Sequence, residues 1–118
     1  MTIKRIKTGA RMSQAVVFNG VVSTAGQVAR NAGGEDAGAQ TRDILQAIDE
    51  LLEAAGTDKS RLLTATIWLA DMGDFAAMNE VWDAWVVPGE TPTRACVESK
   101  LAAPQYTVEI AVTAALPD

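Results

Sequence analysis

The sequence predicts an α+β domain in which two helices cover one face of a β-sheet. Three observations predict this class: a hairpin signal near the N-terminus, two segments with helical spacing of apolar residues, and apolar–polar alternation in the segments after each helix. A chain of 118 residues has the length of one domain, which we place over residues 1–118. The expected order of elements is β-β-β-α-β-α-β-β.

Three short strands are expected before the first helix. The first covers Ile3 to Ile6, and two β-rich runs follow, Ala15 to Phe18 and Val21 to Thr24. Asn19-Gly20 joins these two runs, and Asn-Gly between apolar runs is a strong hairpin signal because both residues tolerate positive φ. Residues 31–38 are rich in Gly, Ala and Asn, which is typical of a loop.

The most regular pattern in the chain predicts a helix from about Ala39. Gly56 follows the last periodic position and is suited to the left-handed conformation that ends many helices. The apolar residues fall at i, i+1, i+4, i+7, i+8 and i+11, which is one face of a helix: Ile44, Leu45, Ile48, Leu51, Leu52 and Ala55.

A strand and a second helix are expected next. Leu62 to Ala70 alternates, which predicts Leu63, Ala65, Ile67 and Leu69 on one face and Thr64, Thr66 and Trp68 on the other. Asp71 and Asp74 are candidate N-caps of the helix, and Pro88-Gly89 ends it. Its buried stripe is expected to be Phe75, Met78, Trp82, Trp85 and Val86.

The last two strands are expected at about Thr93 to Glu98 and Tyr106 to Ala115. Two helices can cover only one face of the sheet, so the other face meets solvent or another subunit. Alternation puts Arg94, Cys96 and Glu98 on one face, and we expect them on the uncovered face together with Glu109. Such a face can simply be solvated, but an arginine in a cleft can also bind a carboxylate bidentately.

Composition excludes several classes of function. The net charge is −5, with 15 acidic and 10 basic residues, which argues against a general nucleic-acid binder. There is no histidine, which removes His-based metal sites and Ser-His triads. The single cysteine, Cys96, cannot form a disulfide within the chain and suits a cytoplasmic location; it is more typical of a small core residue than of a nucleophile. No apolar run has membrane-span length, and no phosphate-binding glycine loop is present.

Several motifs make the chain similar to the Rid superfamily, the reactive intermediate deaminases also called the YjgF family. Their order and spacing carry the resemblance, which runs nearly end to end. The motifs are Ser23-Thr-Ala-Gly-Gln27, Ala39-Gln-Thr-Arg42 leading to Leu52-Glu-Ala-Ala-Gly56, Ile67-Trp-Leu-Ala-Asp-Met-Gly-Asp-Phe75, Met78-Asn79, Pro92-Thr-Arg-Ala-Cys96 and Val108-Glu-Ile110.

The resemblance implies a chorismate-mutase-like α+β fold and a homotrimer with the sheets inside and ligand clefts between subunits. Deaminases of the family hydrolyse enamine and imine acids, such as 2-iminobutanoate and 2-iminopropanoate, to 2-keto acids and ammonia without metal or cofactor. By resemblance, Arg94 binds the substrate carboxylate and Glu109 positions or activates water. The backbone around Gly26 and Cys96 lines the pocket, and Asn79 lies near it.

Two departures from the deaminase pattern bear on function. Met12 stands where a tyrosine is common, and Ala25 stands where a serine often precedes the glycine. Both changes remove hydroxyls that could bind ligand or water. The alternative functions are therefore a non-catalytic trimer that binds small carboxylates or a protein partner, and RNA cleavage or translation inhibition.

Overall fold

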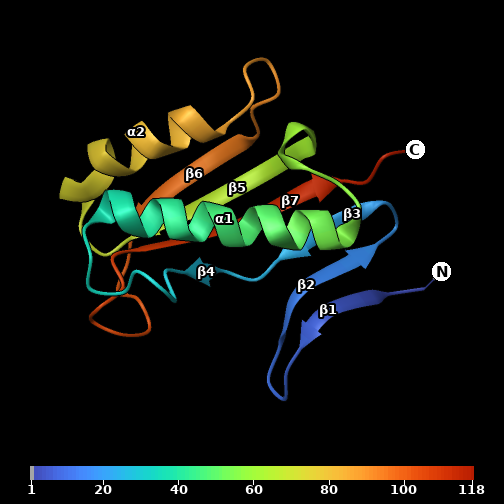
Figure 1. The fold of residues 1–118 in the computed structure, drawn as a ribbon, viewed down its shortest axis with the longest axis horizontal. Coiled ribbons are helices and arrows are strands. Elements are labelled where there is room, and N and C mark those ends of the chain that lie inside the picture. Colours follow the sequence, from blue (N-terminus) through green and yellow to red (C-terminus); the bar gives the residue numbers. More distant parts are fainter. Residues whose placement is uncertain (1) are drawn as a thin grey trace.

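The computed structural model describes residues 2–118, which form one sheet with both α-helices on the same side of it (Figure 1). The strand order is β1-β2-β3-β7-β5-β6, and the short β4 also pairs with β7. All neighbours are antiparallel except β5 and β6, which are parallel because the chain crosses over between them through α2. The predicted α+β class, with two helices on one face, is confirmed.

The N-terminal strands form as predicted, with one addition. β1 spans Lys4–Thr8, β2 spans Ser13–Phe18 and β3 spans Val21–Thr24. Asn19 and Gly20 both have positive φ, 53° and 78°, as the hairpin requires. The addition is β4, Gln27–Val28, which is too short to produce an alternation signal in the sequence.

The first helix, α1, spans Ala37–Ala55. It begins where the Asp36 side chain accepts a hydrogen bond from the Ala39 N–H at 2.9 Å. It ends where Gly56 adopts a φ of 90°, as predicted. Its apolar stripe packs on the sheet, and the predicted stripe residues are all buried: Ile44, Leu45, Ile48, Leu51, Leu52 and Ala55.

Strand β5, Leu62–Leu69, departs from simple alternation at one position. Leu63 was predicted to lie on the buried face, but its side chain is 44% exposed. The pairing register between β5 and β7 shifts between Leu62 and Thr64, so Leu63 is the extra residue of a bulge. The prediction for Leu63 is therefore wrong, and it is Leu62 that packs into the core at this end of the strand.

The second helix, α2, spans Phe75–Trp85 and follows a 3₁₀ turn at Met72–Asp74. The Asp71 side chain caps that turn by accepting from the Gly73 N–H at 2.7 Å, whereas Asp74 makes no capping bond with its side chain. The predicted stripe is buried at Met78, Trp82 and Trp85, while Phe75 is 37% exposed at the margin of the helix.

The last two strands are β6, Thr93–Glu98, and β7, Val108–Ala115. β7 begins two residues later than predicted because the Thr107 backbone leaves the sheet pattern: its N–H donates to the Gln40 side chain at 2.9 Å. β7 is central in the sheet and alternates as predicted. Its helix-facing residues form the middle of the core: Val108, Ile110, Val112 and Ala114.

Candidate functional site

Strand β6 presents Arg94, Cys96 and Glu98 toward the helices, which is opposite to the prediction. In the parallel register, Arg94 lies beside Ala65 and Cys96 beside Ile67, both of which are buried under the helices. Glu98 accepts from the backbone N–H of Met72, just before α2, at 2.9 Å. The expectation that these three residues share the uncovered face with Glu109 is therefore wrong.

The cause of this error is that β6 is an edge strand. Cys96 is its one half-buried residue, and the others are exposed on both faces. Val97, which the pattern predicted to be inward, is 46% exposed. When neither face is deeply buried, the contrast between polar and apolar positions no longer indicates which face points to the core.

Arg94 is held by one face of α2. Its Nη1 donates a hydrogen bond to Asn79 Oδ1 at 2.7 Å. Its guanidinium carbon lies 5.7 Å from the centroid of the Phe75 ring and 5.5 Å from that of Trp82, within the range of cation–π attraction. These three residues fall at i, i+4 and i+7, so they line one side of the helix. Sequence reasoning assigned both rings to packing and missed their contact with Arg94.

Cys96 lies beside this arrangement and packs against the core. Burial raises the pKa of its thiol, an effect that the positive charge of Arg94 only partly offsets. The thiol is therefore protonated at neutral pH, and it has no base among its described neighbours to activate it. This agrees with the interpretation of Cys96 as a small packing residue whose backbone borders Arg94.

Glu109 and Gly26 lie together on the opposite face of the sheet. Glu109 pairs with Val28 of β4 on one side and with Trp68 of β5 on the other. A Cβ atom at Gly26 would overlap the Glu109 carboxylate and would lie 2.9 Å from its Cδ, so only glycine admits the side chain in this position. Burial in this setting raises the pKa of Glu109.

Two positions depart from the deaminase pattern, and each lies next to a strand of the N-terminal part of the sheet. Ala25 precedes Gly26, and its N–H donates to the Gln14 carbonyl of β2 at 2.8 Å. Met12 lies in the turn before β2 and is 48% exposed. A methionine and an alanine offer this region apolar atoms in place of hydroxyls.

Within one chain, the predicted site residues therefore form two groups. Arg94 and Asn79 lie on the helix side at the edge of the sheet, while Glu109 and Gly26 lie on the open side near its centre. β5 separates β6 from β7, which puts the two strands roughly 10 Å apart. With opposite faces as well, the two groups do not line one cleft of a single subunit.

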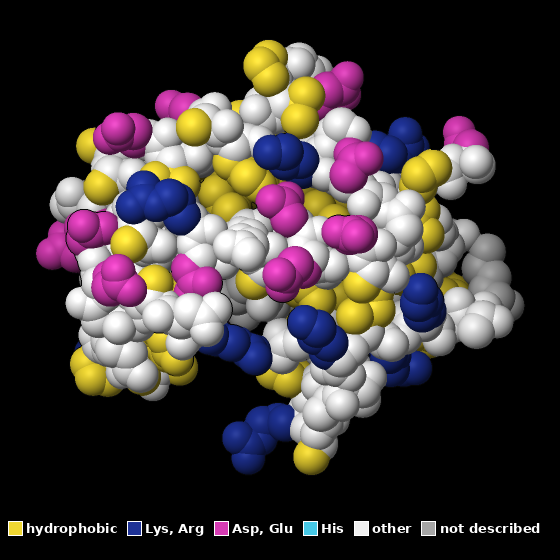
Figure 2. Space-filling view, in the orientation of Figure 1, with side chains coloured by type: hydrophobic (Ala, Val, Ile, Leu, Met, Phe, Trp, Pro, Cys, Tyr) yellow, Lys and Arg dark blue, Asp and Glu magenta, His cyan; other side chains and the backbone are white. Residues whose placement is uncertain are grey.

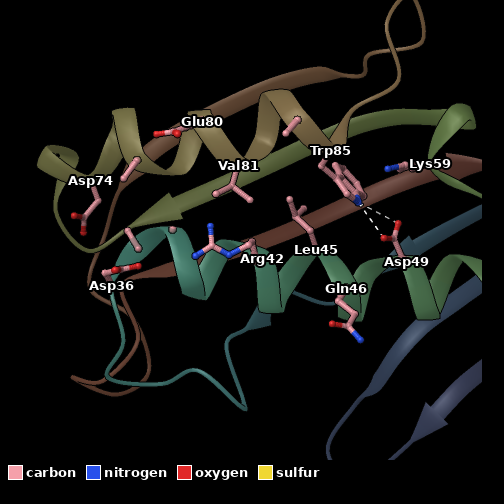
Figure 3. Close-up of a pocket in the computed structure, with 14 residues that line it drawn as sticks. Asp36, Arg42, Leu45, Gln46, Asp49, Lys59, Asp74, Glu80, Val81 and Trp85 are labelled. Atoms are coloured by element: carbon pink, nitrogen blue, oxygen red, sulfur yellow. Dashed lines mark hydrogen bonds between the residues drawn. The ribbon is translucent and has the colours of Figure 1, made fainter.

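A groove lies elsewhere, between α1 and α2 (Figure 3). Its volume is about 820 Å³, and it contains none of the predicted site residues. On its wall, Trp85 Nε1 donates to both carboxylate oxygens of Asp49 at 3.1 Å. Figure 2 shows side chains of both charges around apolar atoms on this side of the molecule. Because the groove contains neither Arg94 nor Glu109, it is not where we place the chemistry.

Two features are absent from residues 2–118. No group of three or more His, Cys, Asp or Glu side chains is arranged to hold a metal ion in this part of the chain. None of its helices has the length and apolar character needed to cross a membrane.

Comparison with known proteins gives consistent matches over nearly the whole chain. Residues 2–116 match the family model described as Endoribonuclease L-PSP. The RutC family protein YoaB of Escherichia coli is 48% identical over 116 residues, which cover 98% of this chain and 100% of YoaB. A crystal structure of a YjgF family member from Neisseria meningitidis has a TM-score of 0.96 at 50% identity, over 100% of this chain and 98% of that one. A Rid family protein from Yersinia pestis, YyfA, has a TM-score of 0.88 at 28% identity, over 98% and 100%.

Proposed function

From its membership of the endoribonuclease L-PSP family, to which the chain belongs together with the YjgF, RutC and Rid proteins, we propose that it is an imine and enamine deaminase. It hydrolyses 2-imino acids to 2-keto acids and ammonia. The observation that carries the proposal is an arginine that is held in place but bonded to no carboxylate among residues 2–118, together with a partly buried glutamate of raised pKa. These are the two groups that such a reaction needs.

We further propose that the working site forms between subunits of a homotrimer. The helices cover one face of the sheet and leave the other open (Figure 1). Glu109 lies on the open face, since it alternates with the buried Val108 and Ile110. Arg94 projects from the edge strand on the other side. A neighbouring subunit set against the open face can supply the group that one chain cannot bring to Glu109. The separation of the two groups within one chain supports this arrangement.

In the proposed reaction, Arg94 binds the substrate carboxylate through two parallel N–H···O bonds and thereby orients the imine carbon. Glu109 accepts a proton from a water molecule as the water oxygen bonds to that carbon, and it then gives this proton to the imine nitrogen. The resulting carbinolamine loses ammonia as its hydroxyl loses a proton, which leaves the 2-keto acid. The raised pKa of Glu109 makes it a stronger base for the first step.

Hydrolysis of the imine requires no further catalytic group, because an imine carbon is already electrophilic. A carboxylate anchor and a base are sufficient, and general base help contributes on the order of 10²–10⁴-fold. We place the reaction in the cytoplasm, which suits the free thiol of Cys96.

The test is an assay of 2-keto acid release from imino acids that an amino-acid oxidase generates in the reaction vessel. The protein should accelerate release above the buffer rate, and Arg94→Ala should reduce this acceleration on the order of 10²-fold because the substrate loses its orientation. Arg42→Ala, an exposed arginine of the inter-helix groove, is the matched control and should retain activity. Equal rates for protein and buffer, or for wild type and Arg94→Ala, would reject the proposal.

The same preparation separates the alternatives. A non-catalytic carboxylate binder, which Met12 and Ala25 would suit, would bind a 2-keto acid through Arg94 but give no turnover. An endoribonuclease, the activity in the family's description, would cleave RNA in an Arg94-dependent way. The net charge of −5 and the absence of histidine argue against the second alternative.

A further inference from the structure

We infer that α2 acts as a positioning element for Arg94, and that Asn79 must be uncharged for the site to accept a carboxylate. This inference rests on the proposed function and names residues that serve it without touching the reacting atoms. The positioning face consists of Phe75, Asn79 and Trp82, which are one and two turns apart on α2 and all contact the Arg94 side chain.

Arg94 has a neutral hydrogen-bond acceptor although carboxylates are close by in the sequence. The nearest one on the same face of β6, Glu98, is instead bonded to the Met72 N–H. Asn79 Oδ1 accepts one N–H of the guanidinium, and its partial charge fixes the direction of the group without neutralising it. An arginine has five N–H donors in a planar fork, so a bidentate pair remains for a ligand.

The rings of Phe75 and Trp82 both lie within cation–π distance of the guanidinium. Trp82 is buried and Phe75 is partly exposed, so the cation rests on one fixed ring and one that borders solvent. Stacking against rings restrains the long side chain and reduces the rotamer freedom lost when a ligand binds. A ring attracts the cation but offers no competing anion, so this support also leaves the charge available.

A single isosteric change tests the requirement for neutrality. Asn79→Asp keeps the shape and the acceptor oxygen 2.7 Å from Arg94 Nη1 but makes it a carboxylate. An intramolecular carboxylate then pairs with Arg94 in the way that the substrate should. We expect KM for imino acids and Kd for 2-oxobutanoate to rise roughly 10- to 100-fold, which is what a charged hydrogen bond contributes. The thermal stability should be unchanged or higher, because the new ion pair is attractive.

Two comparisons control this experiment. Gln46→Glu places the same charge on an exposed position of α1 and should leave KM and Kd within about twofold of wild type, since it alters only the distant field. Phe75→Leu removes the exposed ring but keeps an apolar side chain, and should weaken 2-oxobutanoate binding about 2- to 5-fold. Phe75→Tyr keeps the ring and should bind 2-oxobutanoate as wild type does. If Phe75 served only the stability of the fold, Phe75→Leu and Phe75→Tyr would bind 2-oxobutanoate equally well whenever the two variants were equally stable.

The outcomes separate this inference from the proposed function. If wild type turns over imino acids and Asn79→Asp does so with the same KM, the positioning role is rejected and the deaminase stands. If wild type binds 2-oxobutanoate without turnover and Asn79→Asp binds it weakly, the deaminase is rejected and the positioning role stands. If wild type does neither, both are rejected. Should Asn79→Asp fail to fold, the contrast between Phe75→Leu and Phe75→Tyr decides.

Discussion

On the helix-covered face of β7, Val108, Ile110 and Ala114 are fully buried, whereas Glu109 and Thr113 on the opposite face are only half-buried. The residues of the two faces alternate along one strand and share the same backbone pairing. The two faces differ in what covers them: two amphipathic helices pack on one face, and no helix of residues 2–118 packs on the other (Figure 1). Burial of apolar surface therefore dominates one face, and the other is free to carry a carboxylate beside a glycine.

Residues that serve stability and residues that can serve chemistry are therefore neighbours along one strand. A substitution on the covered face should change the free energy of unfolding and leave the open face intact. A substitution on the open face should change activity or its pH dependence at little cost in stability. The four predictions that follow test this division, from the largest expected effect to the smallest.

Ile110→Ala should destabilise the protein by about 2–5 kcal/mol, because it leaves a cavity at a fully buried position between the helices and the central strand. Urea unfolding followed by circular dichroism measures the change at fixed protein concentration. Glu109→Ala, one residue away on the same strand, is the control and should cost far less. Equal losses for the two variants would contradict the division between the faces.

Gly26→Ala should reduce kcat/KM by tenfold or more, a part of the 10²–10⁴-fold that a general base typically contributes. The added Cβ would overlap the Glu109 carboxylate, so that side chain must swing away. The obstacle is the far end of a flexible side chain, and the midpoint of unfolding should therefore change little. Full activity in this variant would show that Glu109 does not work from its observed position.

Thr113→Ala should cost about 0.5–1.5 kcal/mol, the usual net value of one hydrogen bond. Its hydroxyl lies 2.6 Å from the Thr64 hydroxyl on the open face, between two neighbouring strands. A double-mutant cycle with Thr64→Ala isolates this bond from the other effects of each substitution. A loss as large as that of Ile110→Ala would mean that the open face is covered more tightly in solution than in one chain.

The smallest effect concerns pH. Burial raises the pKa of Glu109, so the folded protein holds this proton more tightly than the unfolded chain does. Its contribution to stability is full below the ordinary pKa of 4.5 and is lost as pH rises through the raised folded value. Glu109→Gln should remove this loss. Its stability relative to wild type should therefore be greater at pH 7 than at about pH 4, as thermal unfolding at both values can show. A difference that shrinks with rising pH would have the wrong sign.

The parts of the fold that sequence reasoning predicted are those with strong contrast between faces. Helix α1 lies between sheet and solvent, so the period of its buried stripe from Ile44 to Ala55 is clear. Gly56 marks the end of the helix by a left-handed conformation that other residues resist. Asn19-Gly20 predicted its hairpin for the same local reason. The bulge at Leu63 was not predictable, because a leucine on a half-exposed surface looks the same as one in the core.

Sequence reasoning named candidate site residues, but it did not predict how they are arranged on the two faces of the sheet. Gly26 and Glu109, which the resemblance named separately, lie in contact, and β4, which brings them together, was not foreseen. Arg94 was assigned to the wrong face because its strand has a partner on one side only and is exposed on both faces. The contact of Phe75 and Trp82 with Arg94 depends on how α2 crosses β6, which is a tertiary property that no local period records.

The position of β7 has a consequence for the order of assembly during synthesis. β7 is central in the sheet and pairs with β3, β4 and β5, yet it is the last of these strands to be made. Val21 of β3 pairs with Ala115, across more than two thirds of the sequence. A nascent chain that stops before residue 108 holds the antiparallel strands β1, β2 and β3 and a separate β5-α2-β6 unit, and no strand pairing links these two parts of the sheet. We expect these halves to stay open on the ribosome until β7 emerges and closes both in one late step.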